Sequence, residues 1–221
     1  MIHADAFIEI DKDITLRRLT RENAQEKFDL IVANHDHLLP WLPWADFYHE
    51  IDDMHGYTDS EIEKFDAGTA ITYDIYYQDQ LVGSIDFNHI SEDDHHAEFG
   101  YWVGQEFTGK GIATRAVAGL TKYAFEKLGF IRVAILACTD NVASVNVAKR
   151  LNFIEEGTLR QYLQLPDGIH DVVVYSKLKT DAWLALPLKH TIKKSLWLME
   201  KSIFRRCLLW LVRSKHSSHS S

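Results

Sequence analysis

The first half of the chain alternates between segments with the two-residue period of strands and segments with the longer period of helices. Residues 13–19 alternate apolar and polar side chains and predict a first strand. Residues 71–77 and 81–87 are rich in β-branched and aromatic residues and flank a short polar turn, so they predict a hairpin. After an acidic turn, residues 95–103 predict a fourth strand.

Helical patterns fill the spaces between these strands. Thr20 precedes an apolar face at helical spacing, as an N-cap residue does, so a helix is expected over about 21–34. Cap residues and early acids predict a second helix near 58–68. A third helix is expected over 111–128, and Gly129 follows it at the position that favours a left-handed residue.

The second half predicts a central strand and a final hairpin. Residues 131–138 form a nearly continuous apolar run, as expected of a strand covered on both faces, and Asn141 caps a helix over 142–151. Residues 153–164 and 169–179 are the last two strands. This order predicts an α/β fold with a mixed central sheet of about seven strands and flanking helices, including a right-handed parallel crossover.

Residues 38–44 pack two prolines and two tryptophans into seven positions, which neither a helix nor a central strand accepts easily. They predict a stiff apolar loop. Such a loop either lines a ligand cavity or covers a helix end, and the pattern alone leaves both open. In the first case Trp41 and Trp44 would contact a substrate.

The chain of 221 residues is long enough for one domain, expected over residues 1–180, with an appendage at 181–221. Its hydrophobic residues, 46% of the total, can form a substantial core. Its two cysteines, Cys138 and Cys207, lie far apart, and acidic residues near the N-terminus interrupt any signal segment. A reducing compartment, most simply the cytoplasm, is therefore expected, with Cys138 as a core residue.

Charge divides the chain into an acidic body and a basic tail. The net charge is −8, but residues 181–221 hold eight Lys and Arg against two acidic residues and carry +6, which leaves −14 on the rest. An acidic body disfavours nucleic acid as a partner and suits a cationic substrate such as an amine.

Residues 188–215 mix basic and apolar side chains without glycine or proline and predict a basic amphipathic helix, followed by a disordered Ser/His end. The charge-free run in this helix is far shorter than the roughly 20 residues of a membrane span. The helix is therefore expected to contact a membrane surface, a partner, or the acidic body itself.

A turn with two glycines, Gly109 and Gly111, joins the fourth strand to the third helix. The first N–H groups of a helix are unpaired, and the helix dipole there attracts an anion such as a pyrophosphate. A P-loop would need Ser or Thr after Lys110, where this chain has Gly111. A dinucleotide fingerprint would need a third glycine, where the chain has Thr114.

The segment from Thr108 to Ala113 resembles the acyl-CoA loop of the GCN5-related N-acetyltransferases (GNAT), written Arg/Gln-x-x-Gly-x-Gly/Ala, and departs from it at Thr108. The chain also resembles RimJ/RimL-type members of this family at residues 38–44, 98–103, 141–149 and 168–176. Asn152 replaces the glycine that is usual in the family. The resemblance spans about residues 13–179.

This resemblance implies that the fourth and fifth strands splay apart and that acetyl-CoA binds in the gap as a co-substrate, without a metal. The residues implied to contact it are Phe99, Tyr101, Val103, Thr108, Gly109, Lys110, Gly111, Ile112, Ala113, Thr114, Asn141, Ser144 and Lys149. A backbone N–H at the splay would stabilise the oxyanion that forms when an amine attacks the thioester.

Attack by an ammonium requires the loss of a proton, so the site needs a base. Glu98 is the first candidate, because strand alternation places it on the same face as Gly100. A solvated strand carboxylate is the alternative, and Asp86 and His89 are reserve bases. Ser144 resembles the serine that protonates the leaving thiolate in RimL-like enzymes, or else it only satisfies the start of its own helix.

The expected substrate-binding residues are Trp41, Trp44, Asp86 and Tyr175. The histidine pairs at 35–37 and 95–96 lack the helical spacing of a zinc site, so no metal is expected. The resemblance implies transfer of acetyl from acetyl-CoA to a primary amine in a ternary complex, most simply the α-amine of a ribosomal protein. A small-molecule amine acceptor, or a non-catalytic acyl-CoA-binding module that docks through its tail, is the alternative. Both a monomer and a homodimer are compatible with the sequence.

Overall fold

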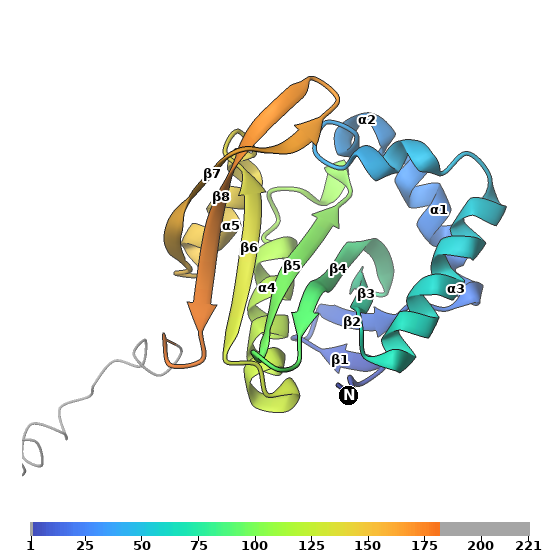
Figure 1. Ribbon diagram of the computed structural model, residues 1–221. Coiled ribbons are helices and arrows are strands. Elements are labelled where there is room, and N and C mark those ends of the chain that lie inside the picture. The colour runs from blue at the N-terminus through green and yellow to red at the C-terminus, as the bar shows by residue number, and fades with distance from the viewer. Residues whose placement is uncertain (1, 182–221) are drawn as a thin grey trace, which may run out of the picture. The chain divides into compact units, whose positions relative to one another are not determined.

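The computed structural model of the protein describes residues 2–181 (Figure 1). The helix predicted over 188–215 and the Ser/His end lie outside these residues. Within the described part of the chain, no helix combines the length and the apolar character needed to cross a membrane.

One mixed sheet forms the centre of the described residues, with the strand order β1-β2-β3-β4-β5-β6-β8-β7. Its strands are β1 (Phe7–Glu9), β2 (Ile14–Arg18), β3 (Ile71–Tyr77), β4 (Gln80–Ser91), β5 (His96–Val103), β6 (Arg132–Cys138), β7 (Ile154–Leu165) and β8 (Gly168–Leu178). All neighbours are antiparallel except β5 and β6. The predicted mixed α/β fold is confirmed, but the sheet has eight strands rather than about seven, because the short edge strand β1 was not predicted.

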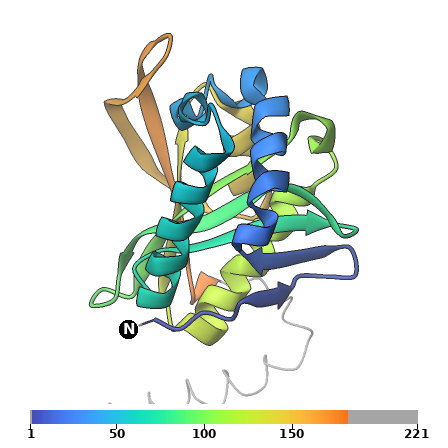
Figure 2. The same cartoon turned by 90° about the vertical axis from the view of Figure 1, so that its right-hand side faces the viewer.

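Five α-helices accompany the sheet, namely α1 (Ala24–Ala33), α2 (His35–Leu38), α3 (Ile51–Ala67), α4 (Ile112–Tyr123) and α5 (Val142–Arg150). Shorter turns of 3-10 helix occupy Arg21–Asn23, Pro43–Phe47 and Gln105–Phe107, and a π-helical turn, Ala124–Leu128, extends α4. Figure 2 shows α1 and α3 side by side on one face of the sheet, with α4 on the other.

The region between α1 and β3 differs from two expectations. The loop expected over residues 38–44 is shorter than predicted, because α2 ends at Leu38 and a 3-10 turn begins at Pro43, which leaves only residues 39–42 outside a helix. Helix α3 begins at Ile51 rather than near residue 58, because Glu50 and Asp53 form a capping box with two acidic side chains. The helix then continues through Gly56, which has open space around its Cα.

Strand β5 separates two hydrophobic clusters. Phe99 belongs to the larger cluster, which includes Val117 and Leu120 of α4, whereas Trp102 belongs to a smaller one with Met54 of α3. Successive side chains of a strand point to opposite faces, so β5 presents Phe99 to the α4 side and Trp102 to the α1 and α3 side. Both faces of β5 are therefore held by packing.

Strands β5 and β6 pair only over the first part of their length. Their register runs from His96 opposite Arg132 to Phe99 opposite Ile135 and ends there. Beyond this point β6 stays paired with β8 as far as Cys138 opposite Val172. The two parallel strands therefore diverge, which confirms the predicted splay between the fourth and fifth strands of the sequence-based count.

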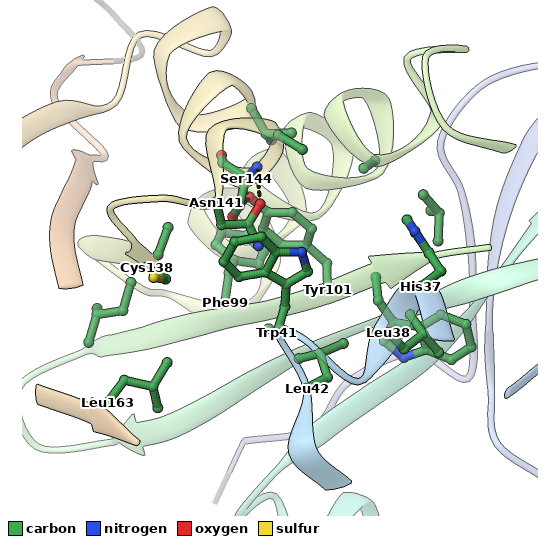
Figure 3. Close-up of a pocket in the computed structure, with 18 of the residues that line it drawn as sticks. His37, Leu38, Trp41, Leu42, Phe99, Tyr101, Cys138, Asn141, Ser144 and Leu163 are labelled. Carbon is green, nitrogen blue, oxygen red and sulfur yellow. Dashed lines mark hydrogen bonds between the residues drawn. The ribbon is translucent and has the colours of Figure 1, made fainter. Parts of the chain in front are cut away.

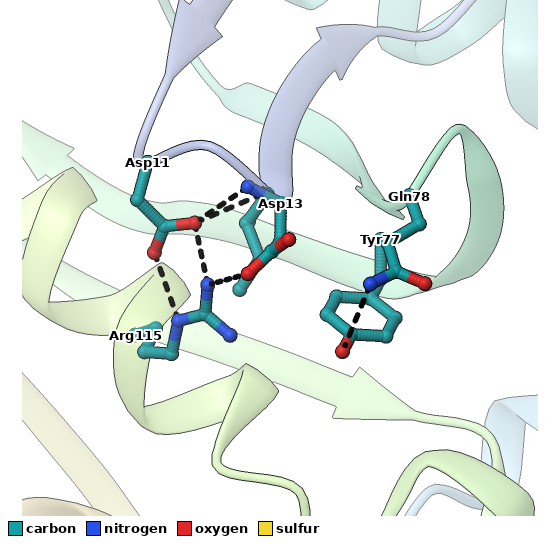
Figure 4. Close-up of polar contacts among 6 residues, drawn as sticks. Asp11, Asp13, Tyr77, Gln78 and Arg115 are labelled. Carbon is teal, nitrogen blue, oxygen red and sulfur yellow. Dashed lines mark hydrogen bonds and ion pairs between the residues drawn. The ribbon is translucent and has the colours of Figure 1, made fainter.

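The start of α4 is tied to the turn between β1 and β2 (Figure 4). Arg115 donates from Nε to Asp11 Oδ2 at 2.8 Å and from a terminal nitrogen to Asp13 Oδ2 at 3.1 Å. The hydrogen bond from Arg115 is the main reason that the pKa of Asp11 lies below its usual range. These contacts of Arg115 fix the N-terminal end of α4, which directly follows the glycine turn.

Candidate functional site

A cavity of about 450 Å³ opens where β5 and β6 diverge (Figure 3). Its walls come from Phe99 to Val103 of β5, from Leu136 to Cys138 of β6, from α5 and from the region of α2. Trp41 and Trp44 both line it, so the structure places these two expected substrate residues at the cavity. Trp44 also packs against Trp102, with ring centroids 6.1 Å apart. The cavity is mostly apolar, with a few polar groups at defined places.

The glycine turn lies between two residues of the cavity lining, Thr108 and Ala113, although Gly109, Lys110 and Gly111 do not line the cavity themselves. Gly109 and Gly111 have φ angles of 73° and 74°, in the left-handed region that favours glycine, and nothing lies within 4 Å of a Cβ added at either position. Gly111 is the N-cap of α4, and no side chain caps this helix end. The first N–H groups of α4 are therefore open to an anionic group.

The side chains of this turn have different surroundings. Thr108 lines the cavity, but its hydroxyl donates to the Gln105 carbonyl at 2.7 Å. Lys110 lies over the Phe107 ring, with Nζ 5.1 Å from the ring centroid. Ile112 is buried in the core, so only its main chain can meet a ligand.

Three further residues were expected to contact the co-substrate, and they differ in whether they line the cavity. Ala113 lines the cavity, whereas Thr114 and Lys149 do not belong to its lining. Lys149 is exposed in the last turn of α5. The small Ala113 thus leaves room beside the glycine turn.

Ser144 contacts a tyrosine at the wall of the cavity, a pairing that the sequence analysis did not anticipate. Its Oγ lies 2.9 Å from the Tyr101 hydroxyl, and its backbone N–H donates to Asn141 Oδ1 at 3.1 Å. Burial raises the pKa of Tyr101 to about 12, so this phenol keeps its proton at neutral pH. Ser144 and Tyr101 together form a protonated hydroxyl pair at the wall of the cavity.

Asp86 of β4 lies directly against Gly100 of β5. The two residues are opposite in the β4–β5 register, and a Cβ at position 100 would lie 2.6 Å and 2.8 Å from the two carboxylate oxygens of Asp86. Only a glycine at position 100 leaves space for this carboxylate, which explains the glycine in the motif. The Oδ1 atom of Asp86 is shielded from solvent and has no hydrogen-bond partner among the residues that the structure describes.

The charge of Asp86 is disfavoured by its surroundings. Burial raises the pKa of Asp86 to about 6, and the Glu61 carboxylate adds to this effect. Lys27 acts in the opposite direction. A carboxylate with an unsatisfied oxygen in such a place is well suited to receive a cation.

Glu98 has a more open position than Asp86. Its Oε2 lies 3.0 Å from Nδ1 of His89, and its side chain is 32% exposed. Glu98 is opposite Asn88, so it lies on the same face of the sheet as Asp86 and Gly100. Neither Glu98 nor Asp86 belongs to the lining of the cavity, whereas Gly100, which Asp86 contacts, does.

Two side chains differ from the role expected of them. Tyr175 on β8 is buried in the larger core, and its hydroxyl donates to Glu155 at 2.8 Å, so the structure does not bring it to the cavity with the other substrate-binding candidates. Cys138 is buried as expected, but it also lines the cavity. The position of Cys138 at the end of the predicted central strand, where β5 and β6 diverge, could have indicated that it lines the cavity.

Comparisons with known proteins agree with this geometry. The family model of the acetyltransferase (GNAT) domain matches residues 13–154. The chain is 36% identical over 181 residues to a putative ribosomal N-acetyltransferase, YdaF, of Bacillus subtilis, with 78% of this chain and 94% of the relative covered.

Two solved structures are similar over most of the chain. One is the microcin C7 self-immunity acetyltransferase MccE in complex with acetyl-CoA and AMP, with a TM-score of 0.75, 28% identity, and coverage of 79% of this chain and 97% of that one. The other is RimL, a ribosomal L7/L12 α-N-protein acetyltransferase in complex with coenzyme A, with a TM-score of 0.76, 26% identity, and coverage of 78% and 97%.

Proposed function

Because the chain belongs to the GNAT family of acetyltransferases, we propose that it transfers the acetyl group of acetyl-CoA to the N-terminal α-amine of a ribosomal protein. It is an acetyl-CoA-dependent N-acetyltransferase, and its structural neighbours hold acetyl-CoA or coenzyme A. The observation that carries the proposal is the opening between β5 and β6, beside a helix end without a side-chain cap. Ribosomal proteins are made in the cytoplasm, and we propose that location for the enzyme.

The residues of the cavity fit acetyl-CoA. The open N–H groups at the start of α4 suit its diphosphate, since anions bind there. The main chain of β5 beyond Phe99 has no partner on β6, so it is free to hydrogen-bond an extended amide-bearing arm. The apolar lining suits the remainder of that arm.

The acceptor amine is expected on the side of β5 that carries Asp86. The Asp86 carboxylate would receive the ammonium next to Gly100, where the wall of the cavity has no side chain. Trp41 and Trp44 would hold the residues that follow the amine. Asp86 would also accept the proton that the ammonium loses, since a base is most effective when its pKa lies near the working pH.

The leaving thiolate needs a proton, and the pair of Ser144 and Tyr101 supplies a route for it. Ser144 donates from Oγ, and the Tyr101 hydroxyl at 2.9 Å replaces that proton. Ser144→Ala is expected to lower kcat by roughly tenfold, which is less than the usual effect of losing a general acid, because Tyr101 remains nearby. Steady-state kinetics check this, with Ser144→Thr as the matched control that keeps the hydroxyl. Equal rates for wild type and Ser144→Ala would leave Ser144 with only its structural role.

Glu98→Gln distinguishes the two candidate bases. We expect a loss of less than about fivefold in kcat/KM, because Glu98 is paired with His89 and partly open to solvent, which screens its attraction for an ammonium to about 1 kcal/mol or less. The measurement is the pH–rate profile of the variant beside that of Asp86→Asn. A larger loss in Glu98→Gln, concentrated at neutral pH and below, would assign the base to Glu98 instead.

Intact-protein mass spectrometry tests the acceptor. The enzyme is incubated with acetyl-CoA and a ribosomal protein extract, and one protein is expected to gain an acetyl group at its N-terminus. Release of CoA with a polyamine, amino acid or aminoglycoside, but without a protein product, would favour a small-molecule acceptor. Binding of acetyl-CoA without turnover of any amine would contradict an enzyme.

A further inference from the structure

Three possible metal ligands meet at the far end of β6, outside the groups assigned to acetyl transfer. Cys138 ends β6, Asp140 follows it, and His170 comes from β8 beside them. One ligand atom from each residue lies within 4.8 Å of the others, and Cys138 lines the cavity. The three residues therefore connect the protein surface with the cavity.

The histidine of this cluster is held between two carboxylates. Its Nε2 lies 2.8 Å from Asp167 Oδ1 in the turn between β7 and β8. Its Nδ1 lies 3.3 Å from Asp140 Oδ2. Both ring nitrogens therefore face carboxylates. A metal at Nδ1 would take the place of the proton shared with Asp140, while Asp167 would hold the proton on Nε2 and so orient the ring.

We propose that Cys138, Asp140 and His170 bind a zinc ion that inhibits the enzyme. A thiolate, an imidazole and a carboxylate are ligand types that zinc prefers, and three protein ligands leave one tetrahedral position open. Tetrahedral zinc requires ligand atoms about 3.3–3.8 Å apart, so the present spacing closes by small side-chain rotations. Binding replaces the thiol proton of Cys138 with zinc and releases that proton to water.

Cys138 and Ser144 both line the cavity, so zinc bound to Cys138 would alter the wall of the same cavity in which the co-substrate is proposed to lie. Inhibition therefore rests on the proposed function, whereas zinc binding itself does not. Acetyl transfer needs no metal, so the site would be a control element that is separate from the reaction.

Titration of the full-length protein with Zn²⁺ alone, and with Co²⁺ as a spectroscopic substitute, tests the site. One equivalent of Co²⁺ is expected to give a thiolate-to-metal absorption band that is lost in Cys138→Ser and kept in Cys207→Ser. Asp167→Asn is expected to weaken zinc binding by 10- to 100-fold, the range for a lost orienting partner, and His170→Ala, which removes a ligand, by more than that. His35→Ala, which removes another histidine between two carboxylates, is the matched control and should change nothing. A missing band, or equal zinc affinity in wild type and His170→Ala, would overturn the site.

The inhibition has its own readout. Zinc at a concentration that fills the site is expected to lower the rate of CoA release by at least tenfold in the wild type, and His170→Ala should resist it. His170 contacts none of the groups assigned to acetyl transfer, so its variant serves as the active reference. Full activity of the zinc-loaded wild type would disprove the inhibitory role while leaving the metal site and the acetyltransferase assignment intact.

Discussion

Replacing Asp86 by asparagine is expected to lower kcat/KM for the amine acceptor by about 100-fold, with little change in the affinity for acetyl-CoA. The variant keeps the shape of the side chain beside Gly100 but loses the charge that receives the ammonium and the group that accepts its proton. A factor of 100 lies at the lower end of general base catalysis and equals about 2.7 kcal/mol. Steady-state kinetics over a range of amine concentrations, with calorimetry of acetyl-CoA binding as the control, measure the two effects separately.

The same substitution is expected to stabilise the folded protein at neutral pH. The pKa of Asp86 in the folded state, about 6, lies above its ordinary value, so folding favours the protonated form. In the wild type, the contribution of Asp86 to the free energy of unfolding is therefore complete below about pH 4 and is lost as the pH rises through 6. Asparagine carries no charge at any pH. The free energy of unfolding of Asp86→Asn should therefore exceed that of the wild type by about 1–3 kcal/mol above pH 7.

Urea unfolding at several pH values tests this gain, and the pH–rate profile tests the base. The wild-type rate should rise as the pH passes through about 6, while the residual rate of Asp86→Asn should lack this step. A variant that is both fully active and less stable at pH 8 would contradict both roles of Asp86. A variant that is more stable but fully active would make Asp86 a merely tolerated buried carboxylate.

Much of the fold could be predicted from local patterns, since the strands from β2 onward and helices α4 and α5 have clear periodicity and caps. The helix bounds between α1 and β3 could not. Pro40 and Pro43 argued for a loop, but proline is accepted at the first turn of a helix, and Pro43 begins a 3-10 turn. Strand β1 has three residues, which is too short for an alternating pattern to appear.

The parts of the site whose residues lie close together in the sequence were predictable. The contacts between residues from different strands and helices were not. The glycine turn and Ser144 belong to continuous motifs. The contact between Asp86 and Gly100, however, depends on the register of β4 and β5, and the pair of Tyr101 and Ser144 depends on a strand and a helix 43 residues apart. The place of Tyr175 depended in the same way on the register of β8, which sets it opposite Ile135 in the core.

Lys27→Met is expected to destabilise the protein by about 3–5 kcal/mol, because it removes one partner of a buried ion pair. Nζ of Lys27 on α1 donates to Asp74 on β3 at 2.8 Å, and to Ser84 on β4 at 3.2 Å. The side chains of the pair are only 4% and 1% exposed. Without Lys27 the Asp74 carboxylate, whose pKa burial already raises, remains in the interior without its counter-charge. Urea unfolding at neutral pH measures the loss.

The double variant Lys27→Met with Asp74→Asn separates this structural role from an effect on the reaction. It removes both charges, so most of the stability lost in Lys27→Met should return, since replacing a buried ion pair is often close to neutral. Lys27 also holds the pKa of Asp86 lower than burial alone would, so its removal should move the acidic limb of the pH–rate profile to higher pH in both variants. Recovery of stability together with a shifted profile would show that one buried lysine supports the fold and sets the pH range of the base. An unshifted profile in the stable double variant would mean that Asp86 does not govern the rate.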